Sequence, residues 1–210
     1  LLLGTSLLLT ALIAVPLGVL AARKKGSAVD RVINVFCLAG ISLPHFWLGL
    51  LLICAFAVKL QWLPASAELT PAAMILPVLT LAISGLAVYM RHLRAAMADA
   101  LKADHIRTAR AKGCSDSRVT WNHAFKNALP PVVTIFMLDL GTLFSGALTV
   151  ETVFAFPGMG KLMFDAVIGN DYNLALAGFL ILSVFVLMAN FVADMLYAFL
   201  DPRVSYAVKK

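Results

Sequence analysis

Charged side chains are scarce in this sequence. Asp, Glu, Lys and Arg make up only 13% of its 210 residues, whereas 61% are hydrophobic. A soluble globular domain has about a quarter of its residues charged, because its surface must be solvated. The polar side chains are too few to cover such a surface, so a soluble globular protein is excluded. The composition predicts an all-α protein that crosses a membrane several times.

Cysteine is scarce as well, and the common catalytic motifs are missing. Cys37, Cys54 and Cys114 show no paired spacing, so neither a disulfide framework nor a zinc site is indicated. The sequence has no phosphate-binding Walker loop, no plausible Ser-His-Asp spacing and no helix with His-Glu metal ligands. We therefore expect no catalytic residue, no metal site and no cofactor on this chain.

Five long apolar runs fill most of the sequence. They cover residues 1–22, 32–60, 72–93, 129–150 and 174–200. Each can cross about 30 Å of hydrocarbon as a helix, the longer ones with a tilt, so we expect five spans. The first run has no basic segment before it, so a cleaved signal peptide is not expected. Pro44 interrupts the second run and should kink that helix between Gly40 and Pro44, since proline removes a helical hydrogen bond.

Lysine and arginine gather in alternate connections between these runs. Of the 17, four lie in residues 23–31, eight in 91–126 and three in 203–210, which leaves only Lys59 and Lys161 elsewhere. Cytoplasmic connections carry the excess of Lys and Arg in membrane proteins. The first run therefore starts outside, and the 91–126 connection and the C-terminus face the cytoplasm. An outside start predicts a sixth span that precedes this sequence.

The most basic segment, residues 103–113, separates the third and fourth runs. Its cations, Arg107, Arg110 and Lys112, fall within two helical turns. Its apolar side chains, Ile106 and Ala109, lie three apart on another face of the same helix. This pattern predicts a short amphipathic helix that ends at Gly113. Lying on the anionic cytoplasmic leaflet would alone explain it, at about 1 kcal/mol per cation.

The residues after Gly113 predict a second short helix. Ser115 is suited to cap it, and it should run to Asn127, with Pro130 and Pro131 opening the next apolar run. On the other side of the basic segment, the apolar stripe of the third run continues, so the third span should extend as a helix toward it. Two short helices hinged at one glycine would then join two spans.

Residues 106–113, followed by 123–130, resemble the cytoplasmic coupling loop of ABC importer permeases of the dipeptide, oligopeptide and nickel family. In the wider superfamily this loop reads Glu-Ala-Ala, three residues, then Gly, whereas Arg107-Thr108-Ala109 stands in its place. The peptide and nickel branch shares this departure. Residues 151–160, with Pro-Gly-x-Gly, and the closing Asp201-Pro202-Arg203 also resemble this family.

The resemblance implies a single transmembrane domain over 1–210 with the type I permease fold. It implies a cytoplasmic coupling loop at 95–127 and a periplasmic loop at 151–172. Within the latter, the Pro-Gly-x-Gly turn itself predicts a short re-entrant or surface helix at 161–168. The ATPase-coupling residues would be Asp104, Ile106, Arg107, Thr108, Ala109, Arg110, Ala111, Lys112 and Gly113. The periplasmic-loop residues would be Glu151, Pro157, Gly158 and Gly160.

The same resemblance implies a set of partners in the bacterial inner membrane. They are a homologous second permease, two cytoplasmic ATP-binding subunits that hold ATP and Mg, a periplasmic solute-binding protein and the lipid bilayer. No nucleic-acid partner is expected. The solute would be a peptide, nickel or a nickel chelate, and the sequence leaves these open.

Three polar residues inside apolar runs are candidates for the translocation path: His45, Asp139 and Ser145. Intramembrane ionisable residues face a cavity or a partner, since exposure to lipid is costly. For His45 a packed or interfacial histidine, hydrogen-bonded to a neighbouring helix, is favoured over a role on the path or as a metal contact, and Asp139 could pair with a neighbouring helix. An ion-coupled secondary transporter would use Asp139 as its carrier carboxylate, but no internal repeat supports it. A membrane-embedded enzyme would need several polar groups at one depth.

We predict that Asp139→Asn slows transport of a cationic solute more than that of a neutral peptide, because the lost carboxylate would line the path. Uptake per assembled complex measures this. A structural Asp139 predicts impaired assembly instead, and equal normalised rates for both solutes would remove it from the path.

Overall fold

The computed structural model describes residues 1–65 and 70–200, and leaves aside the side chains of 137–146, 193 and 196–200. All secondary structure in these residues is helical. The helices are α1 (Leu2–Arg23), α2 (Ala28–Ser42), α3 (His45–Leu52), η1 (Ile53–Lys59), α4 (Pro71–Ala100), α5 (Asp104–Ala111), α6 (Asp116–Arg118), η2 (Val119–Phe125), α7 (Lys126–Val153), α8 (Met159–Ile168) and α9 (Tyr172–Leu200). The segments η1 and η2 are π-helical.

Helices α1 and α4 form the centre of the bundle. The face of α1 that is buried against α4 consists of small residues four apart, namely Ser6, Thr10, Ala14, Gly18 and Ala22. A Cβ on Gly18 would lie 3.1 Å from Leu93 Cδ2, so the two helices approach closely there. Small residues permit such close packing inside a bilayer, where hydrophobic burial between helices contributes little.

Helix α2 stops at Pro44, as the sequence predicts. Leu43 is extended (φ −90°, ψ 124°), the conformation that a following proline favours, and α3 starts at His45. The segments 28–42 and 45–59 are bent by 105° relative to each other. The predicted kink is confirmed, and the second apolar run is a broken helix.

The predicted boundary near Pro130 is wrong. The helix that starts at Asp116 continues through η2 into α7, so both Pro130 and Pro131 lie inside a helix. Side chains supply donors on either side of the prolines: Asn127 Nδ2 donates to His123 O (2.8 Å) and Thr134 Oγ1 to Pro130 O (3.0 Å). These bonds do not replace the two backbone donors that the prolines remove, but a membrane helix tolerates prolines where other local groups satisfy the backbone.

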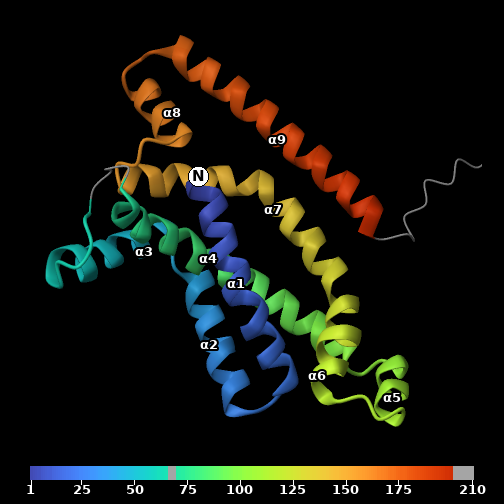
Figure 1. Cartoon of the computed structure of the whole chain (residues 1–210). Helices are drawn as coiled ribbons and strands as arrows, with labels where there is room; N and C mark the ends of the chain where they lie inside the picture. Colours follow the sequence, from blue (N-terminus) through green and yellow to red (C-terminus); the bar gives the residue numbers. More distant parts are fainter. Residues whose placement is uncertain (66–69, 201–210) are drawn as a thin grey trace, which may run out of the picture.

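The long helices form an open bundle with the short helices at its two ends (Figure 1). Helix α5 lies at one end and α8 at the other, while α9 packs against α7 and α8. Among the described residues, three helices are long and apolar enough to span a membrane, or four if the broken pair is one span. The all-helical fold is confirmed, whereas the count of five spans remains a prediction.

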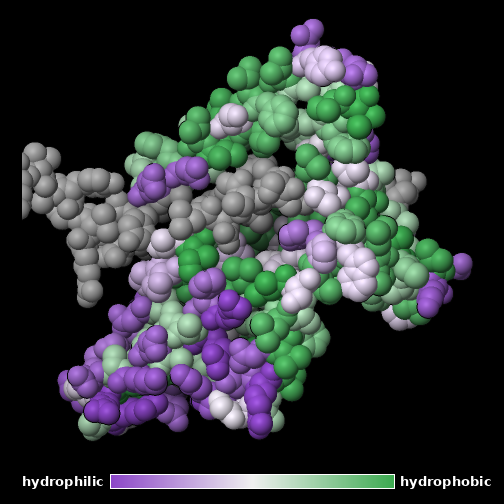
Figure 2. All heavy atoms as spheres, turned by 180° about the vertical axis from the view of Figure 1, so that it is seen from behind, coloured by the Kyte–Doolittle hydropathy of each residue, from purple (hydrophilic) through white to green (hydrophobic). Residues whose placement is uncertain are grey.

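Polar residues gather at the α5 end of the molecule. Figure 2 shows hydrophilic side chains covering that end, whereas apolar side chains cover most of the remaining coloured surface in the same view. Helix α9 exposes a long row of apolar side chains, including Phe179, Val184 and Phe191. This distribution suits a chain that lies in lipid along its length and meets water at its α5 end.

Candidate coupling site and periplasmic loop

Helix α5 is the amphipathic helix that the basic segment predicts. Ile106 is fully buried (0% exposed) and Ala109 is buried, whereas Arg107, Arg110 and Lys112 are exposed. Arg107 Nη1 lies 3.9 Å from Asp104 Oδ1, but both side chains are almost fully solvated, so this ion pair contributes little stability. The helix therefore has one apolar face that packs inward and one basic face that is free to bind a partner.

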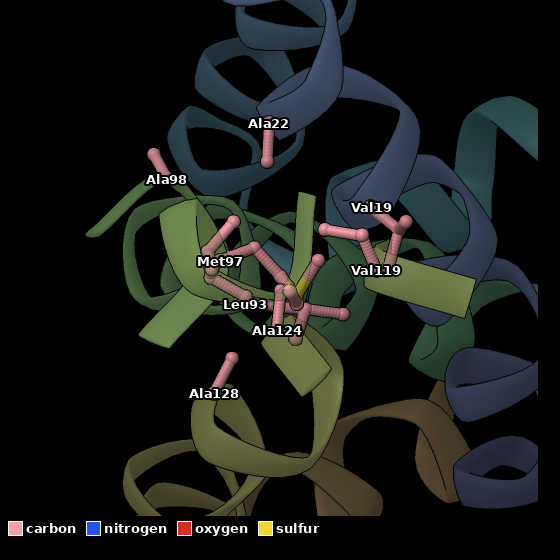
Figure 3. Packing of buried hydrophobic residues seen from close by; sticks show 10 residues of the cluster. Val19, Ala22, Leu93, Met97, Ala98, Val119, Ala124 and Ala128 are labelled. Atoms are coloured by element: carbon pink, nitrogen blue, oxygen red, sulfur yellow. The ribbon is translucent and has the colours of Figure 1, made fainter. Parts of the chain in front are cut away.

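The buried face of α5 joins a hydrophobic cluster, which we call the coupling core. Its buried residues are Val19, Ala22, Leu93, Met97, Ala98, Ile106, Ala109, Val119, Ala124 and Ala128 (Figure 3). They come from α1, α4, α5, η2 and α7. Burying an isoleucine side chain such as Ile106 contributes about 1.5–3 kcal/mol. The coupling core thus attaches α5 to the ends of the long helices.

A Schellman motif ends α5 at Gly113. Gly113 N donates to Arg110 O (2.9 Å) and Cys114 N to Ala109 O (3.2 Å), which is the hydrogen-bond pattern of this motif. Gly113 has φ +79°, as the motif requires of the residue after the C-cap. A Cβ built at Gly113 meets nothing within 4 Å, so only the backbone angle selects glycine there.

The start of the second short helix also follows the sequence prediction. Ser115 Oγ accepts from Arg118 N (3.4 Å) at the start of α6. His105 on α5 and Asn127 at the start of α7 are joined by a side-chain hydrogen bond of 3.2 Å. The third span extends as predicted, since α4 runs to Ala100. These contacts place α5 between the ends of α4 and α7.

At the opposite end, Glu151 on α7 holds the start of α8. Glu151 is 7% exposed, and its Oε2 accepts from Lys161 N (3.1 Å) in the first turn of α8. A buried carboxylate is costly unless it is hydrogen-bonded, and free N–H groups at a helix start are suitable donors. Glu151 therefore caps a helix that lies eight residues further along the chain.

Two glycines of the Pro-Gly-x-Gly motif give Glu151 the space it needs. A Cβ on Gly158 would lie 2.0 Å from Glu151 Cδ, and one on Gly160 would lie 2.5 Å from Leu148 Cα. Neither position can hold a larger residue without movement. Pro157 precedes α8 and cannot continue α7, so the motif predicts both the turn and the helix that follows.

Helix α7 ends in the same way as α5, but with alanine at the critical position. Phe156 N donates to Glu151 O (2.7 Å) and Ala155 N to Thr152 O (3.2 Å). Ala155 has φ +49°, a left-handed conformation that costs a residue with a Cβ about 1–2 kcal/mol. The turn between α7 and α8 is therefore strained.

The family described as binding-protein-dependent transport system inner membrane component matches residues 14–206 of this chain. The chain belongs to this family. The di/tripeptide transport system permease of Pseudomonas aeruginosa is 40% identical over 90% of this chain and 65% of that protein. The oligopeptide transport system permease of Bacillus subtilis is 39% identical over 98% of this chain and 68% of that protein. The chain thus spans about two thirds of the length of these relatives.

Further comparisons agree with this assignment. The glutathione transport system permease of Escherichia coli (strain K12) is 40% identical over 96% of this chain and 66% of that protein. An inward-facing structure of the MetNI methionine ABC transporter has a TM-score of 0.77 and 18% identity, over 95% of this chain and 91% of that chain. An amino acid ABC transporter has a TM-score of 0.64 and 18% identity, over 97% of this chain and 90% of that chain. These structures show that the permease has the type I ABC permease fold.

The three candidate path residues of the permease are not brought together by contacts that the structure describes. His45 is the first residue of α3, and its side chain is exposed. Asp139 and Ser145 belong to α7, but their side chains lie outside the described part of the structure. Their place on the translocation path remains a prediction.

Sequence reasoning missed an ion pair between α2 and α4. Arg94 Nε donates to Asp30 Oδ1 (2.5 Å) and Nη2 to Asp30 Oδ2 (2.6 Å), while the Asp30 side chain is only 4% exposed. The available signal was a single acidic residue, Asp30, among the four cations of residues 23–31. Its partner lies 64 positions further on, and no sequence pattern identifies it.

We predict that Gly158→Ala lowers the stability of the permease by about 1–3 kcal/mol, because the new methyl group would displace the Glu151 carboxylate. The loss should shrink when Glu151→Ala is also present, since the overlapping atoms are then gone. Thermal unfolding midpoints of the purified protein in detergent measure both effects.

Gly160→Ala is the matched comparison. Its methyl group would overlap the main chain of Leu148, so Glu151→Ala should relieve the Gly160→Ala defect far less. Equal relief of both glycine variants, or none for Gly158→Ala, would show that Glu151 does not occupy the space that Gly158 leaves.

Proposed function

We propose that this chain is the membrane-spanning permease subunit of an ATP-driven importer that carries peptides into the cytoplasm. The single observation that carries this proposal is the construction of α5. Its apolar face is packed into the coupling core, and its basic face is exposed at the polar end of the bundle. Such a helix gives a cytoplasmic ATPase a surface to bind that is attached to the spans.

The solute class is proposed from the relatives. Their printed names describe permeases for di/tripeptides, oligopeptides and glutathione. Each of these solutes is a peptide or a peptide-like molecule. Peptides are therefore favoured over nickel or a nickel chelate, which the sequence resemblance alone leaves open.

The proposed partners are inferred from the family description and from the related solved structures. The family description refers to transport that depends on a binding protein, and the related solved structures are ABC transporters. We expect two cytoplasmic ATP-binding subunits at α5, a homologous second permease beside the spans, and a solute-binding protein at the α8 end. ATP binding and closure of the ATPases would then move the bundle between inward-open and outward-open states.

Uptake into proteoliposomes tests the proposal. The full-length permease would be reconstituted with its second permease and ATPases, and supplied with binding protein and labelled tripeptide, glutathione or nickel. We expect peptide uptake that requires both ATP and the binding protein. Uptake driven by an ion gradient without ATP would support the secondary-transporter alternative, and ATP-driven uptake of nickel alone would correct the solute class.

We predict that Gly113→Val lowers the peptide imported per ATP hydrolysed by about five- to thirtyfold. The positive φ at Gly113 costs a residue with a Cβ about 1–2 kcal/mol, and β-branching makes that conformation worse. Because the site has free space around Gly113, the spans should still insert and assemble. Uptake and phosphate release, measured in the same vesicles, give the ratio.

Gly113→Asn is the matched control. Asparagine tolerates the left-handed conformation, so this variant should keep most of the coupling although its side chain is about as large as valine. Normal uptake per ATP in Gly113→Val would contradict a backbone role of Gly113.

A further inference from the structure

The connection between α1 and α2 is built to hold one carboxylate. Gly26, with φ +83°, donates its N–H to Asp30 Oδ2 (2.9 Å), and Asn34 Nδ2 donates to Asp30 Oδ1 (2.9 Å). Ser27 caps α2 by accepting from Asp30 N (3.4 Å). The Asp30 carboxylate is therefore fixed in position from its own side of the connection.

Arg94 on α4 completes the set of donors. Its guanidinium group meets both carboxylate oxygens, so the Asp30 carboxylate accepts four hydrogen bonds from three residues. The Arg94 side chain is 22% exposed and the Asp30 side chain 4%. A buried ion pair loses much of its Coulomb energy to desolvation, so its best-attested use is to fix two elements in one register. Because Arg94 contacts both carboxylate oxygens, it fixes the orientation of α2 relative to α4 as well as the distance between them.

The same turn of α4 also carries the attachment of α5. Leu93 and Met97, on either side of Arg94 in the sequence, are buried in the coupling core with Ile106. One turn of α4 therefore shares the coupling core with α5 and is joined to α2 by an ion pair. Further along α2, Ile33 and Cys37 pack with Ala87 and Met90 of α4.

We propose that the Asp30–Arg94 pair fastens the start of α2 to the coupling end of α4, so that α2 and α5 move as one unit during transport. Asp30 and Arg94 are positioning residues, because they act through helix placement and touch no solute. The inference rests on the proposed function in so far as the moving unit serves ATP-driven import. Displacement of α5 by the ATPase would then be passed through α4 and the ion pair to α2, and along α2 to the 105° break at Pro44.

Distances between two spin labels test the fastening directly. Labels would replace Val35 on α2 and Asp99 at the end of α4, both of which are exposed. The exposed Cys54 and the partly exposed Cys114 would first be changed to serine. In the assembled complex we expect one narrow distance distribution with Arg94 present and a clearly broader one with Arg94→Gln.

Two further variants give controls for this measurement. Arg91→Gln removes the same charge one turn earlier on α4, from an exposed arginine, and should leave the distribution narrow. Arg94→Lys keeps the charge without the planar two-point contact, so it should fall between the wild type and Arg94→Gln. An unchanged distribution in Arg94→Gln would overturn the proposal.

The peptide imported per ATP hydrolysed tests the consequence. Arg94→Gln should lower this ratio about fivefold or more, the lower end of coupling free energies between sites, while Arg91→Gln keeps it. A broader distribution with an unchanged ratio would overturn the transport role of the pair. Failure of the proposed function would appear separately, because the unaltered complex would then show no ATP-dependent uptake. The distance measurement does not depend on ATP, so it tests the fastening of α2 to α4 in either case.

Discussion

The rest of the structure depends on the burial of one helix face. Ile106 and Ala109 of α5 are buried in the coupling core with apolar side chains of α1, α4, η2 and α7, and α5 packs mainly against η2. Because the attachment is apolar, the cations of α5 remain available to a partner in water. Helix α5 therefore separates, within eight residues, a buried apolar face from an exposed basic one.

The two ends of the bundle use different physical means to attach a short helix. At the α5 end the contact is hydrophobic and spread over many side chains. At the α8 end Met163 and Ala166 are buried as well, but a polar contact is added, in which Glu151 accepts from Lys161 N at the helix start. A spread apolar contact tolerates small shifts in geometry, whereas a hydrogen-bonded carboxylate is specific in distance and direction. The α8 end should therefore respond more sharply to single substitutions.

The local features of this fold could be predicted from the sequence. Gly113, Ser115, Pro44 and the Pro-Gly-x-Gly motif each act through the backbone within a few residues, so their effects can be read from spacing alone. The start of α7 was predicted wrongly because η2 leads directly into α7, so both prolines lie inside a continuous helix instead of opening a new one. Asp30–Arg94 could not be predicted, since it depends on how α2 and α4 pack, and the sequence gives no alignment between them.

The strained turn at Ala155 stands between two elements that a single residue, Glu151, holds in place. Of the helix ends closed by a positive-φ residue, Gly113 follows α5 at little cost and Asn170 follows α8 with a residue that tolerates it. Ala155, like Gln61 after η1, instead places a residue with a Cβ in this left-handed conformation, which costs about 1–2 kcal/mol. Glu151 holds the chain beyond this turn through two groups, because its carbonyl oxygen accepts from Phe156 N and its carboxylate from Lys161 N, so one residue fixes both the end of α7 and the start of α8 around the strained alanine.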